Sequence, residues 1–254
     1  MLEDEYPIDE ENRSFDCCLL LWSVILCKIN QSIFFENVSV GESINPFLFE
    51  NVSRGGSEYG GWSYNASGLT PHSIVYSVGL GEDITWDESM MDNHDLHVYG
   101  YDPTPKSEEY LKSRHLDSRF YYSKEGLSTK EGTIAFTKPQ NPLLVSMREG
   151  TIHGRGETIE VKVNTLENWM ERNGHTYLDI LKIDIEGSEY DVLENWIKRR
   201  YFPMGQLLVE FHQRFSSNYK KRHEKVLAGL KDNGFIILYD HNGQEVTFEK
   251  IQKV

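Results

Sequence analysis

From residue 70 onward, short apolar runs alternate with segments whose apolar residues recur at helical spacing. This alternation is typical of a parallel sheet with covering helices. The segments between the runs are long enough for crossover helices, so we expect helices on both faces of the sheet. Five runs are predicted as strands of this sheet: residues 73–78, 96–101, 119–123, 178–185 and 206–211.

Two further apolar runs, 235–239 and 245–248, flank the dipeptide Asn242-Gly243. Asn-Gly between two strands is a strong hairpin signal, so the last strand is predicted to run antiparallel. The expected fold class is therefore α/β, with a seven-stranded, mostly parallel sheet of order 3-2-1-4-5-7-6 and an antiparallel last strand. Three shorter runs predict a local antiparallel β insertion at about residues 130–163; they are 133–136, 143–146 and 159–163.

Helix boundaries are marked by capping residues. Thr165 is expected to cap a helix that follows the insertion. Ser188, with Asp191 three residues later, predicts a capping box at the next helix. The pair Asn233-Gly234 is expected to end the last helix, since glycine readily adopts the left-handed conformation found there.

Composition limits the possible partners. The chain has 254 residues, a formal net charge of −14 and a pI of about 5.1, which argue against a nucleic-acid partner because phosphate neutralisation needs clustered Lys and Arg. Residues 1–49 are expected to form an acidic, partly disordered tail with a short apolar segment, and residues 50–254 the main domain. All three cysteines (Cys17, Cys18 and Cys27) lie in the tail, so the main domain has neither a disulfide framework nor a thiolate nucleophile.

The apolar segment at residues 17–27 has two interpretations. It is shorter than the roughly 20 residues that span a bilayer, and an acidic start is unlike that of a signal peptide. It is either a helix that packs on the domain or a degenerate membrane anchor. Asn-X-Ser sequons favour the secretory pathway, so localisation stays open between cytoplasm and secretory lumen; they begin at Asn12, Asn30, Asn37, Asn51 and Asn65.

A glycine-bearing turn follows the first predicted strand and reads Gly79-Leu-Gly81-Glu-Asp-Ile84. A dinucleotide-binding dehydrogenase prefers a third glycine where Ile84 stands, for close packing of helix on strand. Asp102 lies at the end of the next strand, where an acid accepts hydrogen bonds from ribose hydroxyls. Glycine turn, ribose acid and terminal hairpin together fit an S-adenosylmethionine-dependent methyltransferase better than a nicotinamide oxidoreductase.

The chain resembles the FkbM-type methyltransferases, in particular the branch with the methyltransferase-like proteins of eukaryotes. The most specific block is Lys182-Ile-Asp-Ile-Glu-Gly187, and a Tyr59-Gly-Gly-Trp62 element precedes the first strand. The resemblance extends over about residues 50–250; its five ordered blocks are residues 77–87, 101–105, 126–136, 181–189 and 208–212.

This resemblance implies a Rossmann-like class I methyltransferase domain, S-adenosylmethionine as the methyl donor, and O-methylation of a hydroxyl on a sugar or small molecule. A glycan or small-molecule acceptor is the implied partner, and a catalytically degenerate, ligand-binding methyltransferase fold is the alternative. Within the family pattern, the cofactor-binding positions are Gly79, Gly81, Glu82, Asp83, Asp102, Gly126 and Leu127.

The predicted chemistry lies at the ends of strands four and five, which carry Asp184, Glu186, Glu210 and His212. Side chains alternate along a strand, so these four are expected to line one pocket. His212 is the predicted general base that deprotonates the acceptor, and Asp184 is expected nearest the sulfonium of the cofactor. The three acids are expected to contact cofactor or substrate.

Several simpler readings compete with these roles. His212 is alternatively a structural histidine, and Lys182 is alternatively half of a buried ion pair with Asp184. Converging Asp, Glu and His side chains also suit a divalent cation, but without a recognisable metal-ligand spacing no metal is predicted. Residues 59–62 form either a lid over the cofactor or a glycine turn with a packed aromatic residue.

Overall fold

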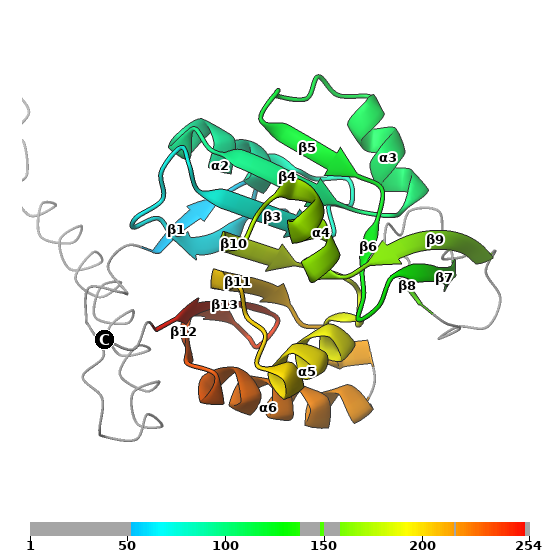
Figure 1. Ribbon diagram of the computed structural model, residues 1–254, viewed down its shortest axis with the longest axis vertical. Helices are drawn as coiled ribbons and strands as arrows, with labels where there is room; N and C mark the ends of the chain where they lie inside the picture. The colour runs from blue at the N-terminus through cyan, green and yellow to red at the C-terminus, as the bar shows by residue number, and fades with distance from the viewer. Residues whose placement is uncertain (1–51, 138–147, 150–157, 216, 252–254) are drawn as a thin grey trace, which may run out of the picture. The chain divides into compact units, whose positions relative to one another are not determined.

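The computed structural model describes residues 52–137, 148–149, 158–215 and 217–251, which all belong to one compact unit, Pro46–Val254 (Figure 1). The predicted tail at 1–49, its apolar segment and the predicted run at 143–146 lie outside these residues. Within the described part of the chain, no helix has the length and apolar character needed to cross a membrane.

The central sheet has seven strands in the order β12-β13-β11-β10-β3-β4-β5. Numbered along the predicted strands, this is the expected order 3-2-1-4-5-7-6. β13 pairs antiparallel with both of its neighbours, which confirms the prediction from Asn242-Gly243. The strands are β3 (Ile74–Val78), β4 (His97–Tyr101), β5 (Phe120–Ser123), β10 (Leu178–Ile183), β11 (Met204–Glu210), β12 (Phe235–His241) and β13 (Glu245–Lys250).

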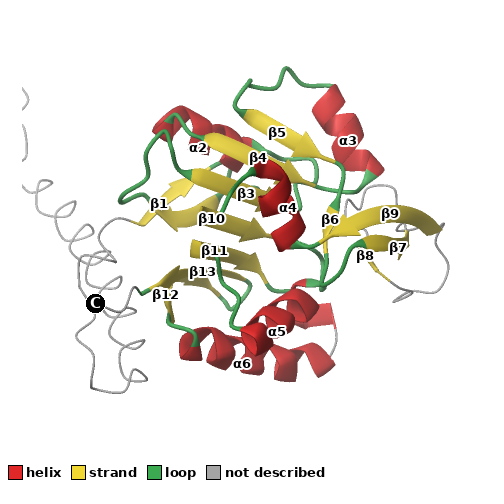
Figure 2. Ribbon diagram, viewed as in Figure 1, coloured by secondary structure: helices red, strands yellow, loops and turns green. Residues whose placement is uncertain are grey.

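Two apolar cores lie on opposite faces of this sheet, as expected for strands that are buried on both sides. Figure 2 shows the helices that flank the sheet. One core contains Trp169 and Trp196 and is covered by α4 (Leu166–Asn173), α5 (Glu189–Arg199) and α6 (Ser217–Asp232). The other core contains Trp62, Trp86 and Met90 and is covered by α2 (Thr85–His94), α3 (Pro105–Lys112) and the hairpin of β1 (Val52–Gly55) and β2 (Trp62–Asn65).

The predicted β insertion is present as a second sheet of order β6-β9-β7-β8. β9 pairs antiparallel with β7 but parallel with β6, so one pair departs from the predicted antiparallel arrangement. In Figure 1 this sheet lies beyond the carboxyl ends of β3, β4 and β10, where it forms part of the site wall. Its strands are β6 (Gly126–Leu127), β7 (Gly132–Thr137), β8 (Arg148–Glu149) and β9 (Thr158–Asn164).

The two predicted helix caps differ in outcome. Thr165 accepts a hydrogen bond from the backbone N–H of Asn168 and caps α4. Ser188 adopts helical dihedral angles and makes no side-chain cap at α5, so the predicted capping box is wrong. Glu189 supplies a hydrogen-bond acceptor at this helix start instead, and its carboxylate accepts the backbone N–H of Gly187 at 2.7 Å.

The sequon at Asn65 lies inside the folded domain. Asn65 is 3% exposed, and its side-chain amide donates to Glu249 at 2.8 Å. Its backbone N–H and carbonyl both bond to the side-chain amide of Gln206. A glycan on Asn65 is incompatible with this packing, so Asn65 gives no support for passage through the secretory pathway.

Candidate functional site

A cavity of about 720 Å³ opens at the carboxyl ends of the parallel strands. Its wall is built from the glycine turn after β3, the end of β4, the β insertion and the ends of β10 and β11. Among the residues that the structure describes, three basic ones line it: Lys130, Lys182 and Arg214. Nine described acids line it as well, so this part of the wall is strongly acidic; they are Glu58, Glu82, Asp83, Asp102, Asp184, Glu186, Asp191, Glu210 and Glu245.

Gly79 allows β3 and β10 to approach each other at the floor of this cavity. Its φ is +82°, and a Cβ at this position would overlap the carbonyl oxygen of Asp184. The ammonium of Lys182 donates to the carbonyl oxygen of Gly79 at 2.8 Å and lies 5.2 Å from the ring centroid of Trp62. The lysine thus anchors the glycine turn; the alternative of a direct ion pair with Asp184 is not found among the described contacts, although the charge of Lys182 acts to lower the pKa of Asp184.

Asp102 organises the same turn. One carboxylate oxygen accepts the backbone N–H groups of Leu80 and Gly81 at 2.9 and 3.0 Å. The other accepts the backbone N–H and the hydroxyl of Thr104 at 2.8 and 2.6 Å. Asp102 lines the cavity, but four donors already use its oxygens, so it holds the turn in place, and ribose binding stays a prediction.

The other predicted cofactor residues lie around the cavity in different environments. The carboxylate of Asp83 accepts bonds from Thr85 and Ser57; burial alone would raise its pKa, but these bonds outweigh burial and lower it. Glu82 has a side chain that is 45% exposed and lies 3.9 Å from Lys106. Both line the cavity, and the structure leaves Glu82 the more accessible to a ligand.

β6 brings the predicted adenine-side residues to the cavity wall. Gly126 and Leu127 both line it, together with Pro103 from the end of β4. A Cβ on Gly126 would lie 3.1 Å from the Pro103 side chain, so the backbone of β6 is closely packed here. These residues give the cavity an apolar flank of the kind that a planar base needs.

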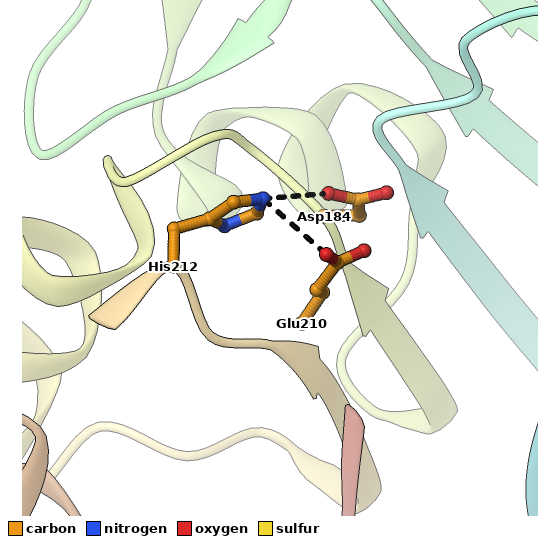
Figure 3. A group of neighbouring side chains, drawn as sticks. All are labelled: Asp184, Glu210 and His212. Carbon is orange, nitrogen blue, oxygen red and sulfur yellow. Dashed lines mark ion pairs between the residues drawn. The ribbon is translucent and has the colours of Figure 1, made fainter. Parts of the chain in front are cut away.

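His212 and three acids form one compact group, which we call the His212 cluster: Asp184, Glu186, Glu210 and His212. Nε2 of His212 lies 3.7 Å from Asp184 Oδ1, 3.5 Å from Glu210 Oε1 and 3.4 Å from Glu186 Oε2. Figure 3 shows the ring edge pointing at the carboxylates of Asp184 and Glu210. The structure thus brings the four predicted residues together, as strand alternation suggested.

His212 sits behind the acids and not in the cavity wall. Its side chain is 1% exposed, and the cavity is lined by Asp184, Glu186 and Glu210 without it. The expectation that the imidazole lines the pocket and faces an acceptor hydroxyl is therefore wrong. The three acids are the members of the cluster that line the cavity.

Glu189, for which no role in the site was predicted, fixes the orientation of the imidazole. It is fully buried, and its Oε1 accepts the backbone N–H of His212 at 2.8 Å. The same oxygen lies 3.3 Å from Nδ1 of the ring. Glu189 lies at the start of α5 and His212 follows the end of β11, so their contact depends on how these two elements pack.

Electrostatics in the cluster are strongly coupled. Burial and the charge of Glu210 raise the pKa of Asp184 to about 7. Burial would lower the pKa of His212, but the hydrogen bond and charge of Glu189 and the charges of Asp184 and Glu186 outweigh it and raise the pKa. Glu186 has a φ of +56°, in the left-handed region that non-glycine residues rarely adopt, and such strain is concentrated at functional sites.

The Tyr59-Gly-Gly-Trp62 element contains the packed glycine turn that was one of its two predicted alternatives. Trp62 is 5% exposed and packs in the core, and a Cβ on Gly60 would lie 2.5 Å from the carboxyl carbon of Asp83. This much is the packed glycine turn. Tyr59 lines the cavity yet is 87% exposed, so its action as a lid stays a prediction.

Comparison with known proteins places the chain in context. Its sequence matches the profile of the family described as "Methyltransferase FkbM domain" over residues 83–237. The Homo sapiens protein named "Probable methyltransferase-like protein 24" is 30% identical over 141 residues, which are 54% of this chain and 32% of that protein. The Rattus norvegicus protein of the same name is 29% identical over 144 residues, 56% of this chain and 34% of that protein. The chain thus aligns with about a third of the length of these curated relatives.

Solved structures of similar fold include a methyltransferase FkbM from Methylobacillus flagellatus KT. It has a TM-score of 0.45 and 14% identity, and the match covers 73% of this chain and 46% of that one. A second is fibrillarin from Aeropyrum pernix, solved with natively bound S-adenosyl-L-methionine. Its TM-score is 0.35 and its identity 13%, with 72% and 67% of the two chains covered.

Proposed function

Because this chain belongs to the FkbM methyltransferase domain family, we propose that it transfers a methyl group from S-adenosylmethionine to a hydroxyl group on an uncharged sugar or other small molecule. The observation that carries this proposal is a row of three carboxylates, Asp184, Glu186 and Glu210, in the wall of a cavity that also contains the glycine turn. The charge and shape of that cavity support the cofactor, the proton acceptor and the uncharged methyl acceptor of this proposal.

The cavity residues fit S-adenosylmethionine. A volume of about 720 Å³ lies within the usual range for sites that enclose small molecules and cofactors. The apolar flank at Leu127 and Pro103 suits the adenine. Asp102 is the ribose acid of the family pattern, and the accessible carboxylate of Glu82, on the cofactor loop of that pattern, is a further acceptor for the hydroxyls of the cofactor. The carboxylate of Asp184 is suited to a positively charged sulfonium, since opposite charges attract strongly in a partly buried site.

Methyl transfer to a hydroxyl requires a group that accepts the proton. When bound, S-adenosylmethionine supplies an electrophilic methyl group: an oxygen–carbon bond forms while the carbon–sulfur bond breaks, and its electron pair stays on sulfur. The hydroxyl proton leaves to a carboxylate of the His212 cluster, because Asp184, Glu186 and Glu210 line the cavity whereas His212 does not. Glu189 and His212 position these acids from behind.

The charge of the cavity limits the acceptor. In the part of the chain that the structure describes, nine acids and three bases line it. A phosphate or carboxylate on the acceptor would therefore meet repulsion, which costs free energy wherever solvent screening is weak. A neutral polyol, sugar or alcohol meets no such cost, and its hydroxyls find many acceptors. This supports an uncharged acceptor.

The proposal is tested by transfer of a labelled methyl group from S-adenosylmethionine to a panel of neutral glycans, alcohols and metabolites, with phosphorylated analogues as the matched comparison. We expect transfer only to neutral acceptors. Asp184→Asn should weaken cofactor binding, measured by calorimetry, and also slow transfer, because the carboxylate faces both partners. Asp191→Asn is the matched control, since Asp191 lines the cavity but pairs with Arg222.

Two outcomes contradict the proposal in different ways. Saturable binding of S-adenosylmethionine without transfer to any acceptor class would identify a catalytically degenerate binding protein. Failure of the folded wild-type protein to bind S-adenosylmethionine or S-adenosylhomocysteine at all would remove the cofactor as well. A ligand at 100 times its dissociation constant raises the free energy of unfolding by about 2.7 kcal/mol, so thermal shift detects binding independently of turnover.

A further inference from the structure

We propose that Asp184, Glu210 and His212 form a binding site for one divalent cation of the Mg²⁺ or Mn²⁺ type. The three residues come from the ends of two neighbouring strands, β10 and β11. Binding of the cation stands on the geometry of these side chains alone; its part in methyl transfer rests on the proposed function.

The ligand atoms are spaced as a shared coordination sphere requires. One atom from each residue, His212 Nε2 and a carboxylate oxygen of each acid, lies within 4.8 Å of the other two. The two measured separations from Nε2 are 3.7 Å to Asp184 and 3.5 Å to Glu210. In an octahedral sphere with bonds of about 2.1 Å, ligand atoms lie about 3 Å apart when adjacent and about 4.2 Å apart when opposite. Small side-chain shifts therefore suffice to close the sphere.

His212 supplies an independent indication. Its ring is 1% exposed, and its Nε2 points at the carboxylates from 3.4–3.7 Å, beyond the usual hydrogen-bond distance of about 2.9 Å. On the other side of the ring, Nδ1 lies 3.3 Å from the fully buried Glu189. A histidine that binds a metal almost always directs its second nitrogen to a carboxylate or carbonyl, which fixes the tautomer and aims the free lone pair at the metal. Glu189 provides that support here.

Electrostatics favour a cation over the bare cluster. Three carboxylates, those of Asp184, Glu186 and Glu210, converge on a single imidazole, and like charges at such distances repel strongly in a partly buried site. A dication offsets this repulsion. Carboxylate oxygens are the preferred ligands of hard cations, and one imidazole among them is compatible with Mn²⁺ as well as Mg²⁺. This makes Mn²⁺ the appropriate spectroscopic probe.

A cation here has direct access to the acceptor, because both acids line the cavity. The hydroxyl oxygen of an acceptor would complete the coordination sphere, and metal ligation lowers the pKa of a bound hydroxyl. The proton then passes to Glu186, which lies 3.4 Å from Nε2 of His212 at the edge of the same cavity. The oxygen attacks the methyl carbon, sulfur keeps the electron pair of the broken bond, and the balance is one proton released for each methyl group transferred.

The test is a Mn²⁺ titration of the full-length protein, followed by electron paramagnetic resonance. We expect one site with a Kd below about 1 mM, within the range of protein sites for hard cations. Glu210→Gln and Asp184→Asn, which preserve side-chain volume, should each weaken binding by about 10–100-fold or more, at least the loss seen when groups behind the ligands are changed. Asp191→Asn, which changes a cavity acid outside the cluster, should bind Mn²⁺ like the wild type. Circular dichroism and thermal unfolding confirm that each variant is folded.

Electron spin echo envelope modulation gives a second readout, because Mn²⁺ that is attracted to the acids without histidine ligation gives no coupling to nitrogen. The wild-type complex should show coupling of Mn²⁺ to one ¹⁴N nucleus, and His212→Gln should abolish it. No Mn²⁺ bound at about 1 mM, equal affinity in Glu210→Gln and Asp191→Asn, or a complex without nitrogen coupling would each overturn the site. Mn²⁺ binding as described in a protein that methylates no acceptor would contradict the proposed function alone. Methyl transfer that is unchanged in EDTA would contradict the cation's part in the reaction, and a protein that methylates an acceptor but binds no Mn²⁺ in the titration would overturn the cation site alone.

Discussion

At the scale of single residues, Asp87 is a carboxyl group enclosed in the core. It lies on the buried face of α2 and is 1% exposed. Burial raises its pKa from 3.8 to about 6, outweighing the opposite effect of the charge on Lys182. The folded state therefore binds this proton more tightly than the unfolded state does.

The sign of the pH dependence follows. As pH rises from about 4 to about 6, the folded protein must ionise a buried carboxyl, so the contribution of Asp87 to the free energy of unfolding falls and stays low above pH 6. At about 1.4 kcal/mol per pH unit, the loss approaches about 3 kcal/mol. Denaturant unfolding should be measured for the wild type and Asp87→Asn from pH 4 to pH 8. Over this range, the free energy of unfolding of the variant should rise relative to that of the wild type by up to that amount. Parallel stability curves would contradict the assignment.

Residue roles were predictable from sequence where they depend on strand alternation. Asp184 and Glu210 follow from the pleat and the strand ends, and their convergence needed only the neighbouring positions of β10 and β11. The inward position of His212 was not predictable, because it depends on Glu189, a contact between residues 23 positions apart. For Asp102 the spacing gave its place at the end of β4, but the four bonds that occupy its carboxylate emerge only when the turn is folded over it.

At the scale of elements, the close approach of β3 and β10 depends on Gly79. Gly68 has a nearly equal φ, +80° against +82°, but no atom lies within 4 Å of its would-be Cβ, whereas a Cβ on Gly79 would overlap the Asp184 carbonyl. Alanine at Gly68 would therefore introduce backbone strain alone, whereas alanine at Gly79 would introduce the same strain and a steric overlap. Gly68→Ala should lower the free energy of unfolding by about 1–2 kcal/mol, the cost of a left-handed non-glycine residue. Gly79→Ala should lose about 4 kcal/mol or more, since the strands must separate.

Chemical denaturation of the two variants under the same conditions provides the measurement. Equal losses of stability would show that the approach of the strands is not tight. Because Gly79 also carries the carbonyl that anchors Lys182, Gly79→Ala should in addition weaken binding of S-adenosylmethionine, while Gly68→Ala should leave it unchanged.

Element order was largely predictable, and the exceptions share a cause. Alternating runs and the Asn242-Gly243 turn indicated all seven strands of the main sheet. The hairpin of β1 and β2 was not predicted, because its strands have only four residues each with mixed polarity. Its position depends on distant contacts, such as the bonds between Asn65 and Gln206, 141 residues apart. Local pattern carries no information about pairings of that kind.

At the scale of the whole molecule, the negative charge of the protein distinguishes nucleic-acid acceptors from uncharged ones. The chain has a net charge of −14, and acids outnumber bases by nine to three among the described residues of the cavity wall. Nucleic acids bind proteins mainly by releasing counterions as Lys and Arg neutralise phosphates. The excess of acids in the described cavity wall opposes this driving force, whichever sequence the nucleic acid has.

We therefore expect no saturable binding of structured RNA or duplex DNA up to about 100 µM protein at about 50 mM salt, where electrostatic binding is strongest. Fluorescence anisotropy with labelled oligonucleotides measures this directly. The titration is run in EDTA and again with Mg²⁺, because a cation held by Asp184 and Glu210 would present a positive charge to phosphate at the cavity wall. Binding in EDTA that weakens steeply with added salt would contradict the prediction and restore a nucleic-acid acceptor. Binding that needs Mg²⁺ and disappears in Glu210→Gln would instead trace any phosphate affinity to the cation site.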